Sequence, residues 1–308
     1  MKKTISRNAG IACILTASAI NGLLPFMVTT IYANGGHFTN IMFYKGIVLV
    51  PVILVYCKLR GISIHVSTKQ NLACALIALF QSATSWLLYG SYELIPTGMA
   101  TTLHFMYPAA VMVIGVILFR DRPAPLELGS LLFCVAAVVL FSNSVSEDFN
   151  GMGVLVALLS AVVYAGYLIA IDKSAAATVP SLLFTFYVFL YNGLFSGIVA
   201  LAAGTFQPLT TVGWAVAIVS AFAAGAVAVA FQRGLPATGS RIGSVLCVAE
   251  PLVSVLVGVL FLQEVFTVKT ALGTACVVTA VVLAALFKKA SKPMDFSRKH
   301  ESDTGAGL

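Results

Sequence analysis

Long runs of apolar residues recur along the chain, and short segments containing glycine, proline or asparagine separate them. A transmembrane helix needs about 20 mainly apolar residues. The strands of a membrane barrel would instead alternate apolar with polar residues, and these runs do not alternate. The pattern therefore predicts an all-α integral membrane protein with ten transmembrane helices. We place them near residues 9–31, 40–57, 71–92, 98–119, 125–142, 152–171, 181–203, 212–231, 241–262 and 267–287.

The composition excludes several other classes of protein. Of the 308 residues, 59% are hydrophobic and 9% are charged, whereas a soluble domain has about 25% charged residues. This composition excludes a soluble domain and a disordered chain. A nucleic-acid-binding protein is excluded because the net charge of +7 comes from scattered lysines and arginines. The six cysteines form no CxxC pair and no cluster with histidine, so we expect no disulfide framework, no metal and no cofactor.

The basic residues predict the orientation in the membrane. All but two of the 18 lysines and arginines fall in the terminal tails and the even-numbered loops; the exceptions are Lys45 and Lys269. Because cytoplasmic loops carry the excess of basic residues, we expect both termini in the cytoplasm and the loop with Glu147 and Asp148 outside. The expected location is the bacterial inner membrane, which the chain crosses several times.

The sequence repeats itself at a displacement of 143 residues. This displacement aligns residues 10–15 with 153–158, 43–44 with 186–187 and 103–108 with 246–251. We therefore expect a first repeat over 1–146, a second over 147–290 and a disordered cytoplasmic tail over 291–308. Each repeat holds five predicted helices, an odd number, so the two repeats have inverted topology. Inverted repeats are typical of secondary transporters.

Through single residues within these two repeats, the chain resembles the EamA-type, ten-helix branch of the drug/metabolite transporter superfamily. The resemblance covers about residues 8–288 and rests on Pro108, on Glu250 with Pro251, on Glu264, on Gly273 and on a basic residue in the second helix, Lys45. Arg120 and Asp121 depart from it, because the family commonly has Gly-Glu there. The resemblance implies an exporter of a small metabolite or drug-like compound.

Two charged residues lie inside predicted helices, where an ionised side chain costs about 2.5–3.5 kcal/mol. Lys45 could neutralise an anionic or carboxylate-bearing substrate, or it could snorkel to the membrane surface. Glu250 precedes Pro251 and should be protonated or paired. It could bind a substrate amine or carry a coupling proton. Alternatively, it could pair with Lys45 or satisfy backbone groups that the proline frees.

His104 lies in the fourth predicted helix, three residues before Tyr107 and on the same face. It could relay protons or donate to a substrate, or it could be a histidine hydrogen-bonded between helices. The repeat places Tyr107 opposite Glu250. Further candidates for the lining of a cavity are polar or aromatic residues of the third, sixth and seventh helices, although such residues also serve in helix packing. These candidates are Ser85, Trp86, Tyr89, Tyr164 and Tyr187.

The leading functional hypothesis is a secondary transporter that works by alternating access, with a site near the midplane between the repeats. Its substrate is a small metabolite or drug-like compound, such as an amino acid or a derivative of one, and protons could drive it. The expected partners are this substrate and the lipid bilayer, without nucleic acid, in a monomer or a homodimer. The alternative is an intramembrane enzyme that uses Lys45, His104 and Glu250. The chain contains no HExxH, GxSxG or Walker motif.

Overall fold

The computed structural model describes residues 5–119, 125–142, 150–238 and 246–287. Within these ranges the regular structure is entirely helical, so the predicted all-α class is confirmed. The helices are α1 (Arg7–Gly22), α2 (Leu24–Tyr32), η1 (Phe38–Asn40), α3 (Ile41–Leu59), α4 (Thr68–Ser91), α5 (Thr97–His104), α6 (Tyr107–Phe119), α7 (Pro125–Ser142), α8 (Gly151–Lys173), η2 (Ala175–Thr178), α9 (Ser181–Ala202), α10 (Thr211–Thr238), α12 (Ala249–Phe261) and α13 (Val268–Phe287).

Within the described residues, seven helical segments are long and apolar enough to cross a membrane. Three shorter apolar helices, Leu128–Leu140, Ala249–Phe261 and Val268–Leu283, accompany them. The chain is thus a multi-pass membrane protein. That ten helices cross the bilayer, and that both termini are cytoplasmic, stay predictions.

Local sequence signals set where several helices begin. Ser67 accepts a hydrogen bond from the backbone N–H of Gln70, and the Gln70 side chain accepts one from the backbone N–H of Ser67. This reciprocal capping box satisfies backbone donors at the start of α4 that have no partner within the helix. Asn150 caps α8 through the N–H of Gly153. Pro96 and Pro180 directly precede α5 and α9.

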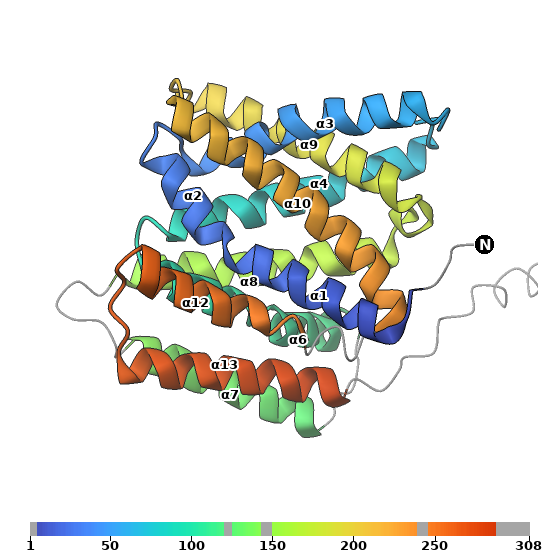
Figure 1. Cartoon of the computed structure of the whole chain (residues 1–308). Coiled ribbons are helices and arrows are strands. Elements are labelled where there is room, and N and C mark those ends of the chain that lie inside the picture. The colour runs from blue at the N-terminus through green and yellow to red at the C-terminus, as the bar shows by residue number, and fades with distance from the viewer. Residues whose placement is uncertain (1–4, 120–124, 143–149, 239–245, 288–308) are drawn as a thin grey trace, which may run out of the picture.

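The helices run along a roughly common axis and pack in a row (Figure 1). Helices α3 and α9 pack together at one end of the row, and α7 and α13 pack together at the other. Between them, α1 packs on α10 in the way that α8 packs on α4. Likewise α1 contacts α12, while α8 contacts α5 and α6. Each contact thus has a counterpart in which the two halves of the sequence exchange roles, which fits a two-repeat architecture.

The predicted spans at 9–31 and 98–119 match two of these apolar segments, Arg7–Tyr32 and Thr97–Ile117, but each contains two helices where one was predicted. The first divides at Leu23 into α1 and α2, and the second divides at Phe105 and Met106 into α5 and α6. A proline follows each division within two residues, Pro25 in one case and Pro108 in the other. Proline lacks the N–H that would continue the helical ladder and clashes with the preceding turn.

The predicted helix at 241–262 shows a third interruption. Residues 241–245 lie outside the described part of the chain. Leu246 is helical, Cys247 and Val248 form a turn, and α12 starts at Ala249. Pro251 again follows the interruption. This break lies at the position that the 143-residue displacement assigns to the break between α5 and α6.

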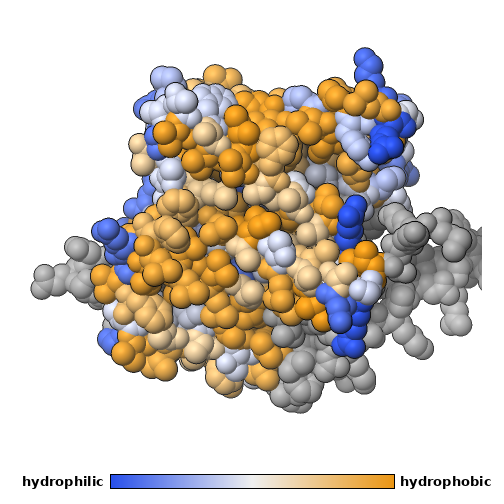
Figure 2. All heavy atoms as spheres, viewed as in Figure 1, coloured by the Kyte–Doolittle hydropathy of each residue, from blue (hydrophilic) through white to orange (hydrophobic). Residues whose placement is uncertain are grey.

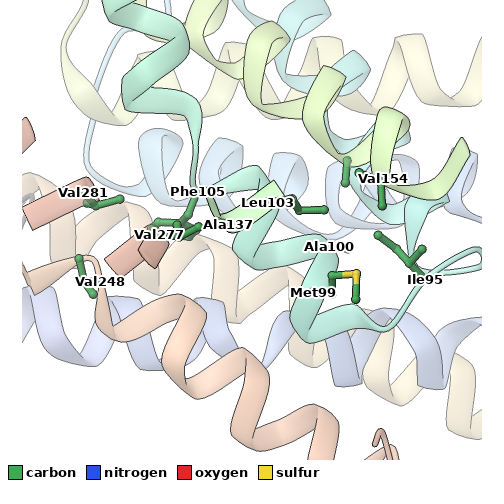
Figure 3. Close-up of a cluster of buried hydrophobic side chains, with 11 residues drawn as sticks. Ile95, Met99, Ala100, Leu103, Phe105, Ala137, Val154, Val248, Val277 and Val281 are labelled. Carbon is green, nitrogen blue, oxygen red and sulfur yellow. The ribbon is translucent and has the colours of Figure 1, made fainter. Parts of the chain in front are cut away.

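A large hydrophobic cluster surrounds α5 (Figure 3). It combines residues of α5 and its flanks with side chains of α7, α8 and α13. Its buried members are Ile95, Met99, Ala100, Leu103, Phe105, Ala137, Val154, Ala157, Val248, Val277 and Val281. Every residue of α5 is buried, including its last residue, His104. The packing therefore fixes His104 in the interior.

Figure 2 shows a broad band of hydrophobic residues across this face, with hydrophilic residues gathered at its left and right edges, near the helix ends. Many large apolar side chains are exposed, among them Leu132 at 71% and Leu201 at 71%. An exposed apolar surface of this extent is unusual for a soluble monomer. It suits contact with lipid.

The crossing of α3 and α9 depends on two glycines. A Cβ atom on Gly46 would lie 2.8 Å from the Cα of Gly193 and 3.0 Å from the backbone oxygen of Phe189. Small residues at such crossings let helix backbones approach closely in membranes. Gly46 and Gly193 therefore permit the close approach of α3 and α9.

We predict that Gly46→Ala lowers the free energy of unfolding by about 1–3 kcal/mol, because overpacking forces the helices apart. Thermal unfolding of the purified protein in detergent measures the change. Gly129→Ala is the matched control, since the added Cβ atom meets no described atom within 4 Å beyond its chain neighbours and the backbone of its own helix. Equal melting temperatures for the two variants would contradict the prediction.

Candidate functional site

The three helix interruptions lie close together and carry polar residues. A Cβ atom on Gly22, at the end of α1, would lie 2.9 Å from the backbone oxygen of Glu250 at the start of α12. The interruption between α5 and α6 carries His104 and Tyr107, and both of these helices pack on α8. Breaks in transmembrane helices that meet at a repeat interface are typical of substrate sites in transporters.

Glu250 is held by an amide from the opposite end of the sequence. Asn21, in the last turn of α1, donates from Nδ2 to Oε2 of Glu250 at 3.1 Å. No ion pair joins Glu250 to Lys45 in the part of the chain that the structure describes, so the predicted structural alternative of a Lys45–Glu250 pair is not what the structure contains.

His104 is 7% exposed and is oriented by a serine. Its Nδ1 atom lies 2.9 Å from Oγ of Ser160. The Ser160 hydroxyl donates its single hydrogen to the backbone oxygen of Ala157 at 2.6 Å. Nδ1 of His104 must then carry the hydrogen that Ser160 accepts. In the neutral ring this leaves Nε2 as an acceptor.

Aromatic rings from both repeats surround His104 and Tyr107. The ring centroids of Tyr107 and Tyr164 lie 4.9 Å apart and the ring planes are 77° apart, an edge-to-face arrangement. Tyr167 stacks on Tyr164 at 5.2 Å. The His104 ring lies 5.1 Å from that of Tyr164 and 6.0 Å from that of Tyr107. Because Tyr164 and Tyr167 lie on α8, this cluster spans the two halves of the sequence.

The sequence displacement relates these contacts to each other. Tyr107 corresponds to Glu250, and Asn21 corresponds to Tyr164. Asn21 contacts Glu250, and Tyr164 contacts Tyr107. Equivalent positions of the two repeats are therefore in contact in both places, as an amide with a carboxylate in one and as two phenols in the other. The framework repeats while its chemistry differs.

Lys45 is buried at 2% exposure on α3. Its Nζ atom donates to the hydroxyl of Tyr89 at 3.3 Å and lies 5.5 Å from the centre of the Tyr89 ring. Tyr89 is itself held from a second side, because the hydroxyl of Tyr32 donates to its backbone oxygen at 2.8 Å. Lys45 has no carboxylate partner among the described residues. Because the Lys45 side chain is buried, it does not snorkel to the membrane surface in this structure.

Tyr92 contacts both the tyrosine beside Lys45 and a residue of α5. Its ring centroid is 5.8 Å from that of Tyr89, the partner of Lys45, and its hydroxyl lies 3.1 Å from the hydroxyl of Thr101 on α5. Tyr92 thus joins the surroundings of Lys45 to α5.

The remaining candidates have different surroundings. Ser85 is buried one turn before Tyr89. Trp86 donates from Nε1 to Ser196 of α9 at 3.2 Å. Tyr187 donates to the backbone oxygen of Ile64, in the segment between α3 and α4. Packing between elements accounts for Trp86 and Tyr187, whose part in a substrate site stays a prediction.

Glu264 fastens the start of α5 to the end of α12. Its Oε1 atom accepts from the backbone N–H and the hydroxyl of Thr97 at 2.6 and 2.7 Å, and Oε2 accepts from the N–H of Gly98 at 3.2 Å. A carboxylate suits a helix N-terminus, where free N–H groups and the helix dipole favour negative charge. Beside it lies a cavity of about 280 Å³, whose lining includes Val255 and Phe266.

We predict that Glu264→Ala lowers the free energy of unfolding by about 1–3 kcal/mol, because three donors at the start of α5 lose a charged acceptor. The apparent melting temperature of the purified protein reports the loss. Glu93→Ala, which removes an exposed carboxylate, serves as the control. A melting temperature for Glu264→Ala that equals that of the control would show that the clamp adds no stability.

Some predicted features lie outside the described residues. These are Arg120, Asp121, the loop with Glu147 and Asp148, and the tail at 291–308. Among the described residues, no group of three or more His, Cys, Asp or Glu side chains could hold a metal ion. All six cysteines are free.

Sequence reasoning missed Asn21 and Tyr92. Asn21 lies 229 residues from its partner Glu250, so no local pattern reveals the contact. The repeat carried a usable signal, since it pairs Asn21 with the candidate Tyr164. Tyr92 follows the end of α4, where a tyrosine is as readily explained by the membrane interface.

Comparisons with known proteins agree with this architecture. The model of the EamA-like transporter family matches residues 8–143 and again residues 151–286. The uncharacterized transporter sll1319 of Synechocystis sp. is 33% identical over 91 residues, which cover 29% of this chain and 28% of that protein. The match therefore spans well under a third of the relative's length. A solved crystal structure superposes with a TM-score of 0.63 at 19% identity, covering 91% of this chain and 99% of the other, and it supports the fold alone.

Proposed function

The chain belongs to the EamA-like transporter family, a branch of the drug/metabolite transporters, and on this premise we propose that it is a secondary-active exporter of a small metabolite or drug-like compound. It works by alternating access in the bacterial inner membrane. Ten helices cross the bilayer, in one repeat over 1–146 and an inverted one over 147–290, and both termini are cytoplasmic.

One observation carries the proposal: polar residues of both repeats meet where helices are interrupted. Asn21 and Tyr107 of the first repeat approach Glu250 and Tyr164 of the second. A site shared between two inverted repeats changes its accessible side when the repeats exchange conformations. No such exchange is needed for a channel or for an enzyme.

The charged and titratable residues receive distinct roles in this proposal. Lys45, with Tyr89, neutralises an anionic group of the substrate, such as the carboxylate of an amino acid or a derivative. His104 offers Nε2 as a proton acceptor in the aromatic cluster, and Glu250 binds a substrate amine or carries the coupling proton. An enzyme that used these three residues would need them around one reacting atom, and no hydrogen bond, ion pair or ring contact among the described residues joins any two of them.

The test is efflux of a labelled panel of small metabolites, amino acids first, from cells that overproduce the protein. We expect faster loss of at least one compound than from cells with the empty vector. An uncoupler that collapses the proton gradient should abolish the difference. Efflux that an uncoupler leaves unchanged would contradict proton coupling, and equal efflux of every compound in both cells would contradict export.

A further inference from the structure

Glu264 joins the two repeats at the end of the molecule where α5 begins and α12 ends. Its carboxylate accepts three hydrogen bonds from Thr97 and Gly98, the first two residues of α5. We call this contact the Glu264 clamp. Thr97 lies in the first match to the family model and Glu264 in the second. Because α5 ends at His104 and rises 1.5 Å per residue, the clamp lies about 10 Å along this helix from the interruption.

Two glycines let the clamp form. A Cβ atom on Gly258 of α12 would lie 2.9 Å from Cδ of Glu264, so a side chain at this position would displace the carboxylate. A Cβ atom on Gly98 would lie 3.0 Å from the Cα atom of Val255. The start of α5 and the middle of α12 therefore meet with no space for a side chain between their backbones.

The two parts of the predicted helix at 98–119 are packed unequally. Every residue of α5 is buried, and Figure 3 shows its position within the hydrophobic cluster. Along the described side chains of α6, at 107–117, only Ala109 is buried, while Val116 and Ile117 are exposed. The bundle thus encloses the half that the clamp holds more tightly than the other half. An alternating-access carrier is likewise closed at one end at a time.

Water can replace the donors of the clamp. Glu264 is only partly buried, and the cavity of about 280 Å³ is lined by this residue together with Gly98 and Val255. A water molecule takes about 30 Å³ in the liquid, so the cavity has room for water beside the carboxylate. A carboxylate that leaves the start of α5 is then hydrated and avoids the cost of an unpaired buried charge. The contact is therefore suited to repeated opening and closing.

We propose that the Glu264 clamp is a gate, which holds the start of α5 against α12 while this end of the carrier is closed and releases it when this end opens. The gate rests on the proposed function, because alternating access requires each end to open in turn. Glu264 does not bind the substrate in this role. It sets the share of time for which this end is open.

Labelling of a cysteine behind the clamp tests the gate without transport. Val255→Cys places a thiol of similar size where the start of α5 covers it, at a position 8% exposed. The full chain in lipid nanodiscs reacts with N-ethylmaleimide, and peptide mass spectrometry follows each cysteine separately. We expect Glu264→Gln to raise the labelling rate of the introduced thiol by about 10- to 100-fold, since the three hydrogen bonds lose their charged acceptor. Glu93→Gln, at an exposed position, is the matched control.

Two native cysteines show whether a variant loosens the whole protein. Cys74 on α4 is 0% exposed and Cys134 on α7 is 2% exposed, and they belong to two other hydrophobic clusters. Opening of the gate should leave their labelling rates unchanged, whereas general loosening should raise all the rates together. An unchanged rate at the introduced thiol, or an equal rise at all three cysteines, would overturn the proposal.

A reversible cross-link tests the gate during transport. Thr97→Cys combined with Glu264→Cys places two thiols at the clamp, and a short bis-methanethiosulfonate reagent joins them in proteoliposomes. The bridge should abolish uptake relative to the same protein before treatment, and a reductant should restore it. The two single variants, treated in the same way, control for reaction with native cysteines. A clamp that only stabilises the fold would be replaced by the bridge, so undiminished uptake by the bridged protein would overturn the gate.

The carrier and the gate can fail separately, because labelling needs no second compartment. The expected labelling without transport of any compound would contradict the carrier and keep the opening of this end. Transport by the bridged protein would keep the carrier and reject the gate. If Glu264→Gln does not fold, Gly258→Ala takes its place, since the added methyl group displaces the carboxylate and should raise the labelling rate in the same way.

Discussion

Glu250→Gln is expected to lower gradient-driven transport into proteoliposomes by about 10- to 100-fold, while the protein remains folded. Glutamine has nearly the shape of glutamate and retains an oxygen that can accept from Asn21. It can neither carry a proton nor balance a cation. The variant therefore removes the two functions proposed for Glu250 and little of the packing.

Two further measurements identify which function is lost. Glu250→Asp keeps the carboxylate and should retain part of the transport, while Glu93→Gln should behave like the wild type. If Glu250→Gln still exchanges labelled for unlabelled substrate but no longer accumulates it, Glu250 carries the proton. If exchange is lost as well, Glu250 binds the substrate. Full gradient-driven transport by Glu250→Gln would contradict both roles.

The second large effect concerns Lys45, for which stability and function should change in opposite directions. Lys45→Met removes a buried cation without a carboxylate partner in the described residues and replaces it with an apolar chain of similar length. Because an unpaired buried charge is unfavourable, we expect the free energy of unfolding to rise by about 1–3 kcal/mol. Transport of a carboxylate-bearing substrate should nevertheless fall by about 10-fold or more.

The comparison with Lys45→Arg completes this prediction. Arginine keeps the positive charge, so the variant should transport more than Lys45→Met and should not gain the same stability. Thermal unfolding in detergent and uptake by proteoliposomes are measured on the same preparations. A methionine variant that is less stable than the wild type and transports normally would show that Lys45 serves the fold through Tyr89 and not the substrate.

The sequence predicted the helical class well because length and apolarity alone decide it. The ranges of α3, α4, α8 and α9 begin and end within a few residues of the predicted ones, since capping residues such as Ser67 and Asn150 are local signals. The interruption at Leu23 was missed, although Pro25 follows it. Pro25 lies inside the predicted helix at 9–31, where a proline is a signal for a kink or a break, so the sequence did contain this signal.

The sequence predicted which residues belong to the candidate site better than it predicted which residues contact each other. His104, Tyr107, Tyr164 and Glu250 were selected because polar groups are costly in a membrane, and the structure brings the rings of the first three together. Their partners depended on the crossing of helices far apart in sequence. The contact of Asn21 with Glu250 arises because Gly22 lets α1 approach the start of α12, a property of side-chain volume that periodicity does not express.

Glu264 illustrates the same limit in another way. The family resemblance selected it as a residue at the end of a helix, without a partner. The structure shows why a carboxylate is suitable there, since the start of α5 offers two backbone N–H groups and a hydroxyl. Gln263 is in a left-handed conformation with φ of 55°, in the turn that leads the chain from α12 to Glu264. Turn geometry of this kind at a non-glycine residue is hard to foresee from sequence.

The most direct test of the central claim is exchange across the membrane of proteoliposomes. Vesicles are loaded with an unlabelled compound that the cell assay identifies, and uptake of the labelled compound is followed without an ion gradient. A carrier with one alternating site must return its site across the membrane, so unlabelled compound inside should accelerate labelled uptake in the wild type, and Glu250→Gln should lack this acceleration if Glu250 binds substrate. Uptake by the wild type that is indifferent to the compound inside would contradict alternating access, and chemical conversion of the compound by detergent-solubilised protein would point to an enzyme.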